Sequence, residues 1–294
     1  MEFLLVLAAA LAPAILLFFY IRKKDEKRPE PVGMLLKAFG GGILSVILAI
    51  ILALVFKWLG LYVDTYNTYE GAVRYAFFGA ALPEELMKFF IFWLVVRKNR
   101  FFDERVDGIV YASCVALGFA ALENIFYLFG NYDSWVTVGI VRALFSVPGH
   151  FFFGVLMGYY YALVKFKNPS IFNMCMVLAA PIFAHTVFDT ILMSMGLNPL
   201  FFFLLLAFFI IFFVFLRKKA LRSIKEQLQE DDRAFEVLET ESAELPDVTE
   251  NPQCGVSVDA SFSNQESLNE QPANNEEAIE DYIYNKYIDT DKKA

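Results

Sequence analysis

Ionisable side chains stand inside several long apolar stretches of this chain, where they are unexpected. They are Glu84, Glu85, Glu123, His150, His185 and Asp189, and the two histidines are the only ones in the sequence. An ionisable group in a lipid-length segment costs a few kcal/mol on insertion scales, so several such groups are rarely accidental. We therefore predict a buried polar site inside a membrane protein.

The spacing of these residues suits metal-assisted or acid–base chemistry. His185 and Asp189 are four residues apart and share one helix face, so they can hold one ion, or the carboxylate can fix the imidazole tautomer. Two histidines with carboxylates suit a borderline metal such as zinc, with three protein ligands and one bound water. The candidate ligands are His150 and His185, with Asp189 or Glu123 as the third. Glu84 or Glu85 is then the candidate base for that water.

The same residue types permit other arrangements. The histidines can stabilise a tetrahedral oxyanion directly, without a metal. Lys88, four residues after Glu84, can tune the glutamates by charge. Glu85 points about 100° away from Glu84 around a helix, so we expect it to face a different partner. A structural ion network of Glu84, Glu85 and Lys88 is the plainer alternative. No Ser-His-Asp arrangement, HExxH helix or GxGD signature is apparent.

The elements that must position these residues are membrane-spanning helices. Hydrophobic residues make up 57% of the chain, and runs of apolar residues recur at the length that crosses a bilayer. The predicted spans are about 3–21, 34–58, 73–96, 108–129, 136–164, 171–194 and 199–216. Alternating strand patterns are absent. The predicted fold is therefore all-α, a polytopic membrane helix bundle of about seven spans.

The polar residues fall at similar depths on four of these spans, so they can converge in one cavity. A proline accompanies three of the motifs and opens the helix near the polar group, at Pro83, Pro148 and Pro181. Gly154 and Gly158 share a helix face with His150, where small residues allow a neighbouring helix to approach closely.

The loops alternate in charge. Basic residues follow the first, third, fifth and seventh spans, at 22–24, 97–100, 165–167 and 217–219, whereas the other loops are neutral or acidic. The positive-inside rule then places the amino terminus outside and the carboxyl terminus in the cytoplasm.

The carboxyl-terminal part differs in composition from the rest. The net charge of −8 arises largely from this part, which opens with a charged helical pattern and then becomes polar. We predict two parts, a membrane-embedded unit over 1–219 and a cytoplasmic, acidic, largely disordered tail over 220–294. Three cysteines in separate places suggest no disulfide framework. The lipid bilayer is the expected surrounding, and no nucleic-acid partner is expected.

Four runs together resemble the PrsW family of intramembrane proteases. They are PEELMK, GFAALENIFY, VRALFSVPGHFFFGVLMGYYYAL and HTVFD. The resemblance covers about residues 1–216, and it extends to the related CAAX-processing and bacteriocin-protection membrane proteases. Glu84 and Glu85 match the Glu-Glu motif, Glu123 a Glu-Asn pair, His150 the middle histidine, and His185 with Asp189 the last motif.

The resemblance implies an endopeptidase in a bacterial-type plasma membrane that cuts membrane-bound, single-span proteins. Some members of the family cleave anti-sigma factors and so start a signalling cascade. The resemblance also implies zinc as a cofactor, although related enzymes have been argued to work without a tightly held metal. From the residues alone, an ion or small-molecule transporter with a midplane carboxylate and histidine site is the main alternative. A receptor or scaffold with a structural polar cluster is the third.

Overall fold

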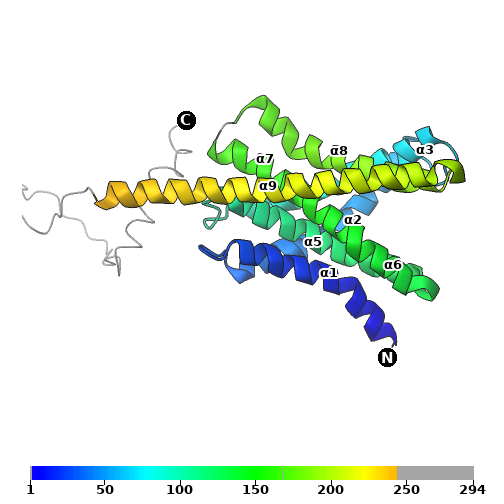
Figure 1. The fold of residues 1–294 in the computed structure, drawn as a ribbon, viewed down its shortest axis with the longest axis horizontal. Helices are drawn as coiled ribbons and strands as arrows, with labels where there is room; N and C mark the ends of the chain where they lie inside the picture. The colour runs from blue at the N-terminus through cyan, green and yellow to red at the C-terminus, as the bar shows by residue number, and fades with distance from the viewer. Residues whose placement is uncertain (1, 168, 244–294) are drawn as a thin grey trace, which may run out of the picture. The chain divides into compact units, whose positions relative to one another are not determined.

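The protein is helical throughout the residues that the computed structural model describes, which are 2–167 and 169–243 (Figure 1). The long helices are α1 (Glu2–Lys24), α2 (Val32–Trp58), α4 (Leu82–Val96), α5 (Arg105–Gly130), α7 (Val147–Phe166), α8 (Ile171–Met195) and α9 (Phe202–Ala243). The shorter ones are α3 (Tyr69–Arg74), α6 (Trp135–Val141), the π-helical segments η1 (Tyr75–Ala81) and η3 (Arg142–Ser146), and two single 3₁₀ turns, η2 (Tyr132–Ser134) and η4 (Pro199–Phe201). The all-α prediction is confirmed.

Six helical stretches in this part of the chain are long and apolar enough to cross a membrane. The third predicted span, 73–96, is not among them. It is nevertheless one unbroken helical stretch, in which α3, η1 and α4 follow one another. Its apolar character is interrupted by Glu84, Glu85 and Lys88. The segment that departs from the membrane-helix pattern is therefore the one that carries three charges of the predicted site.

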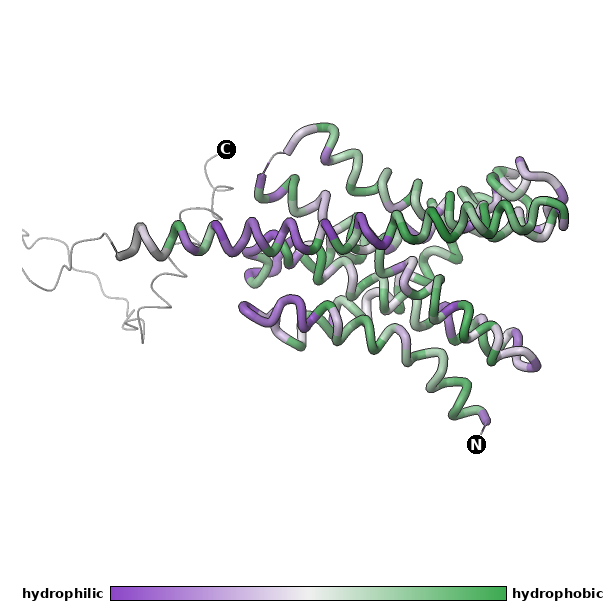
Figure 2. Tube along the Cα trace, viewed as in Figure 1, coloured by the Kyte–Doolittle hydropathy of each residue, from purple (hydrophilic) through white to green (hydrophobic). Residues whose placement is uncertain are grey.

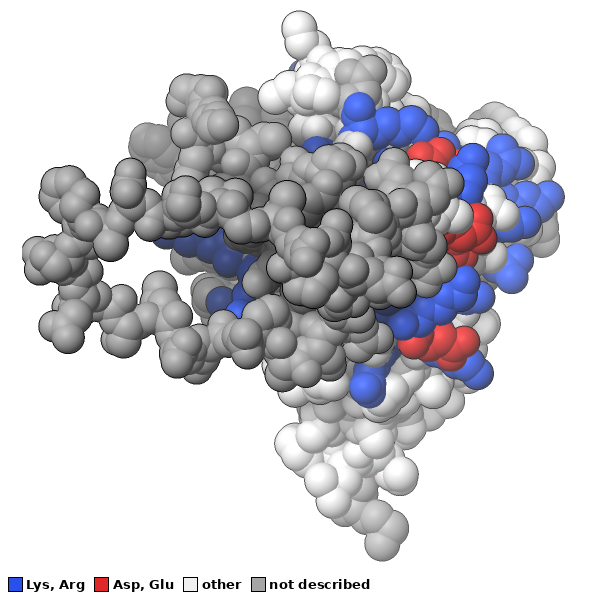
Figure 3. Space-filling model, turned by 90° about the vertical axis from the view of Figure 1, so that its left-hand side faces the viewer, with Lys and Arg blue, Asp and Glu red and all other residues white. Residues whose placement is uncertain are grey.

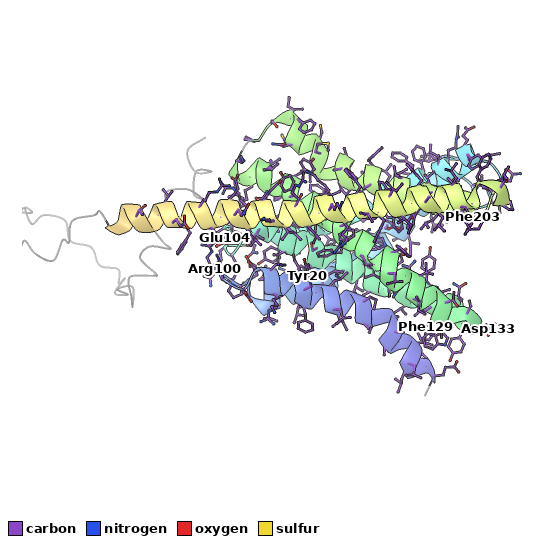
Figure 4. All side chains as sticks on the ribbon, viewed as in Figure 1. Tyr20, Arg100, Glu104, Phe129, Asp133 and Phe203 are labelled. Atoms are coloured by element: carbon purple, nitrogen blue, oxygen red, sulfur yellow. The ribbon has the colours of Figure 1, made fainter. Side chains whose placement is uncertain are left out.

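Successive long helices run in opposite directions, so that alternate loops meet at the same end of the bundle (Figure 1). Arg100 and Glu104 lie at one end, and Asp133 and Phe203 lie at the other (Figure 4). Lys and Arg side chains gather across the visible part of the first end (Figure 3). This alternation is the arrangement that the charges of the loops predict.

Helix α5 is the central element of the bundle, and most of its side chains are buried. It packs against α1, α2, α4 and α7. Glycines let its neighbours approach closely, because a methyl group at Gly158 of α7 would overlap the Gly108 carbonyl, and one at Gly42 of α2 would overlap that of Val115. The predicted role of Gly158 in close packing is confirmed. This packing sets the spacing between the helices that carry the polar residues.

Large apolar side chains point outward along α1, α2 and α9, as expected for surfaces that face lipid. Figure 2 shows hydrophobic residues along the first half of α9 and hydrophilic residues along its second half. Phe209 and Phe213 in the apolar half contact Phe188 of α8. Helix α9 continues without a break past residue 219, where the predicted boundary falls, and the compact unit reaches Asp232. The predicted disorder beyond residue 243 lies outside the described residues.

A group of carboxyl side chains surrounds the start of α5. This end cluster consists of Asp25, Glu30, Glu104, Asp107 and Asp231. Asp231 of α9 accepts hydrogen bonds from the backbone N–H groups of Arg105 and Val106, at 3.1 and 2.8 Å. Asp107 and Glu104 form a reciprocal capping box at the same helix start. Residues near the end of the compact unit thus cap the central helix.

Candidate active site

All six ionisable residues singled out in the sequence lie together in the interior of the bundle. They come from four helices, as their depths predict: Glu84 and Glu85 from α4, Glu123 from α5, His150 from α7, and His185 and Asp189 from α8. The rings of His150 and His185 are 5.2 Å apart and perpendicular. We refer to these six residues with Lys88 as the glutamate–histidine site.

Lys88 lies at the centre of this site. Its Nζ atom is 2.9 Å from Glu85 Oε1, 3.3 Å from Glu84 Oε2 and 3.1 Å from His150 Nδ1. The sequence predicted contact with Glu84 but a different partner for Glu85. Glu85 does meet a different partner, His185. The long lysine side chain nevertheless also reaches Glu85, because the two glutamates lie three and four residues before it.

His185 is held between carboxylates. Its Nδ1 atom is 2.9 Å from Glu85 Oε1, and its Nε2 atom is 3.3 Å from Asp189 Oδ2 and 3.9 Å from Glu84 Oε2. Phe153 stacks on the imidazole with 4.7 Å between ring centres. The shared helix face of His185 and Asp189 thus produces a direct contact, and the ring has a fixed orientation.

His150 is oriented by a chain of contacts that includes Arg142, which was not singled out in the sequence, and Asn124, the second residue of the Glu-Asn pair. Its Nε2 atom is 2.8 Å from Glu123 Oε2, and the same oxygen accepts a hydrogen bond from Arg142 at 2.8 Å. Arg142 also donates to the side chain of Asn124 at 2.6 Å. The signal for Arg142 was present, since it is a charge within the fifth predicted span, eight residues before His150.

Two of the three prolines follow π-helical segments, in which a backbone bond spans five residues instead of four. The N–H of Leu82, before Pro83, bonds to the Phe77 carbonyl, and the N–H of Val147, before Pro148, bonds to the Arg142 carbonyl. Such turns concentrate at functional sites. They confirm the expected change of the helix beside Glu84 and His150. Pro181 lies within an α8 that continues through it.

The carboxylates of the site differ in access. Glu85 is fully buried, and its Oε2 atom has no hydrogen-bond partner among the described residues. The side chains of Glu84, Glu123 and Asp189 keep 16, 18 and 18% of their surface exposed. Both histidines are buried. A substrate or a water molecule can therefore reach Glu84 and Asp189 more readily than it can reach Glu85.

The donor types suit a metal ion, but their present contacts do not. One ligand atom each from Glu84, Glu85, His150 and His185 lies within 4.8 Å of the others. Every ring nitrogen of the two histidines already faces Lys88 or a carboxylate. The Lys88 ammonium contacts three of the four groups. As the side chains are arranged, these residues do not fit a zinc ion unless Lys88 moves away.

Comparison with known proteins identifies the family. A model described as PrsW family intramembrane metalloprotease matches residues 30–216. The chain belongs to the PrsW family. Protease PrsW of Clostridioides difficile is 37% identical over 189 residues, which cover 63% of this chain and 77% of that protein. Protease PrsW of Oceanobacillus iheyensis is 35% identical and that of Bacillus subtilis 33%, over 65% of this chain and 84% of each relative.

Membership of the PrsW family makes this chain a multi-pass membrane protein and an intramembrane protease. The matched region contains every residue of the glutamate–histidine site. The family is described as metalloproteases, and the site holds groups of the kind that bind metals. No solved structure matches the chain.

Proposed function

We propose that the protein hydrolyses a peptide bond of a single-span membrane protein at the glutamate–histidine site, with Glu84 as the base. The difference between the two adjacent carboxylates carries this assignment. Glu85 is enclosed, and its Oε1 atom holds both Lys88 and His185. Glu84 is more accessible and lies 3.9 Å from His185 Nε2. A base must reach the water that it activates, which favours Glu84.

In the proposed reaction Glu84 takes a proton from water as the water oxygen attacks the peptide carbonyl carbon. The carbonyl becomes an oxyanion, which a hydrogen-bond donor in the site stabilises. We assign this role to the Nε2 atom of His185, which must turn its hydrogen from Asp189 to the oxyanion, while Glu85 and Phe153 keep the ring in place. Glu84 then returns the proton to the amine that leaves when the C–N bond breaks. His150 and Glu123 complete the site by holding Lys88 in place.

Zinc held by His150, His185 and Asp189 is the other form of this proposal. The substrate and the base stay the same, and the metal would polarise the carbonyl or the water. This form requires ring nitrogens to leave their present partners, among them Lys88 and Glu123.

The expected substrate is a membrane-bound regulator such as an anti-sigma factor, cut near the outer surface. The outer position follows from the proposed orientation, in which the basic end of the bundle faces the cytoplasm. Counted along the predicted spans, the polar residues then fall between the midplane and the outer third of the bilayer. Cysteines introduced at Asn67 and Asp133 of a cysteine-free chain should react with an impermeant thiol reagent from outside. Cysteines at Lys98 and Lys167 should not. Labelling of the opposite pair would reverse the orientation.

A cleavage assay tests the proposed reaction. The full chain is placed in liposomes with a single-span reporter that is tagged at both ends, and we expect two discrete fragments. E84Q should lower the rate about 10²–10⁴-fold, because the amide lacks the basic oxygen. E70Q is the matched control, since Glu70 is exposed and pairs with Arg74 outside the site. Cleavage by E84Q at the parental rate would remove Glu84 as the base. Ion flux without cleavage by the parental chain would favour the transporter.

A further inference from the structure

The central position of Lys88 leads to an inference about the cation of this site. Its ammonium group has three hydrogens and no acceptor. Three acceptors surround it: Glu84 Oε2, Glu85 Oε1 and His150 Nδ1, at 2.9–3.3 Å. The side chain is 1% exposed, and Nζ lies 3.9 Å from the centre of the Phe119 ring, which adds a favourable cation–π contact. Every donor of the group is therefore used inside the site.

The same acceptors are those that a metal ion would need. Glu84, Glu85 and His150 are three of the four residues whose ligand atoms lie within 4.8 Å of one another. A divalent ion bound to these residues would lie next to the Lys88 ammonium, and the two positive charges would repel each other strongly in the buried site. Moving Lys88 out would leave its charge without partners in an apolar interior, which is also unfavourable. One cation therefore excludes the other.

The contacts of His150 agree with an ammonium in this position. Its Nε2 atom lies against the Glu123 carboxylate, which can only accept, so Nε2 carries the hydrogen. Nδ1 then presents a lone pair, and the donor facing it is Lys88. Arg142 donates to the same oxygen of Glu123. The chain from Arg142 to Lys88 is consistent at each step without a metal.

We propose that the Lys88 ammonium is the resident cation of the glutamate–histidine site and occupies the place that zinc would take. Lys88 acts as a positioning residue: it neutralises Glu85, aligns Glu84 toward the substrate and fixes the tautomer of His150. The positioning role of Lys88 rests on the proposed function, because it assumes that Glu84 is the base. The occupancy of the site by one cation or the other can be measured without any cleavage.

The test compares zinc content in chains purified under the same conditions, incubated with zinc chloride and then desalted. The parental chain should hold no stoichiometric zinc. K88M removes the ammonium and keeps an apolar stem. Glu84, Glu85 and His150 then lose Lys88 as a partner and can bind a metal together with His185, so about one zinc ion per chain should bind. K57M is the matched control, because Lys57 pairs with Asp64 in an exposed position. It should behave as the parental chain does.

A second variant guards against loss of folding in K88M. K88R keeps the positive charge, so it should exclude zinc and retain more cleavage activity than K88M. Activity of the parental chain should also survive treatment with 1,10-phenanthroline.

Stoichiometric zinc in the parental chain, removed by the chelator together with activity, would overturn this inference and leave the protease proposal standing. Absence of zinc from folded K88M would overturn it too, because the four groups would then form no cation site. Failure of the parental chain to cleave any reporter would instead count against the proposed function, whatever the zinc content.

Discussion

Among the described residues, buried carboxyl side chains form two groups, and their hydrogen-bonding needs are met in different ways. In the glutamate–histidine site the partners are other side chains, as where Lys88 and His185 meet on Glu85. In the end cluster many partners are backbone N–H groups, as where Asp231 caps the first turn of α5. The first arrangement leaves accessible carboxylates and one unpartnered oxygen on Glu85. The second fixes the end of a helix.

This difference shows how to tell buried charged residues that take part in a reaction from buried charged residues that only support the fold. Side chains that contact one another can change partners during a reaction, because none of them is required to complete a helix. A carboxylate that caps a helix cannot leave without exposing backbone donors. We therefore expect changes in the first group to affect catalysis most, and changes in the second to affect local stability.

The largest expected effect separates the two neighbouring glutamates. E84Q should lose cleavage by about 10²–10⁴-fold with little change in the free energy of unfolding, because Glu84 acts mainly in the reaction. E85Q should lose activity and also be less stable, because Lys88 and His185 would share a neutral amide. Cleavage rates and chemical unfolding in detergent measure both quantities. Equal loss of stability in the two variants would show that Glu84 is also structural.

Removal of the Arg142 charge tests whether the ion pair between Arg142 and Glu123 is needed for stability and cleavage. Breaking a buried ion pair by removing one partner costs about 3–5 kcal/mol, so R142M should be strongly destabilised. It should also slow cleavage, because Glu123 would no longer be held against His150. R74M is the matched control, since Arg74 and Glu70 form an exposed pair, worth about 0–1 kcal/mol. Similar unfolding energies for R142M and R74M would contradict the role of Arg142.

A smaller effect is expected from two adjacent aspartates in α9. D231A removes the carboxylate that caps α5, and loss of a cap costs about 0.5–2 kcal/mol. D232A removes only an exposed pair with Lys27 and should change little. Hydrogen exchange at the amides of Arg105 and Val106 should rise in D231A alone. Equal exchange in both variants would mean that the cap is not formed.

The smallest effect concerns pH at the end cluster. Burial raises the pKa of Asp25 to about 6, that of Glu30 to about 7 and that of Glu104 to about 8. These groups bind protons more tightly when folded. Their contribution to stability is therefore fully present below the ordinary carboxyl pKa of about 4 and is lost as the pH rises from there to the folded pKa values, that is, up to about pH 8. Hydrogen exchange near Glu104, corrected for its intrinsic pH dependence, should increase over this range. The loop around Asp133 is the internal control, and E104Q should weaken the pH response.

The sequence predicted the helices and the meeting of the six polar residues because both depend on distance along the chain. An apolar run measures a span, and position in the run gives the depth of Glu123 or His150. Rotation about each helix axis is a different matter. The π-helical turns change that rotation locally, and nothing in the composition of Tyr75–Ala81 specifies it.

Contacts between distant parts were the other feature that the sequence could not provide. Arg142 was visible as a charge in a span, but its partner Glu123 is on another helix. Asp231 lies in a segment that composition assigns to the tail, yet it caps α5, more than a hundred residues earlier. Such pairings depend on how helices cross, and a single sequence carries no record of that.

The π-helical turns before Pro83 and Pro148 set the direction in which Glu84 and His150 point from their helices. Adding or removing one residue in such a turn would change that direction. Each turn holds one residue more than an α-helical turn. Removing one residue from Tyr75–Ala81 would restore a regular helix and turn Glu84 by about 100° relative to the preceding half of the helix. The rotation of this helix, and not only the identity of its residues, therefore brings Glu84 round to face the histidines. A change of chain length well outside the site would be enough to take that carboxylate away from it.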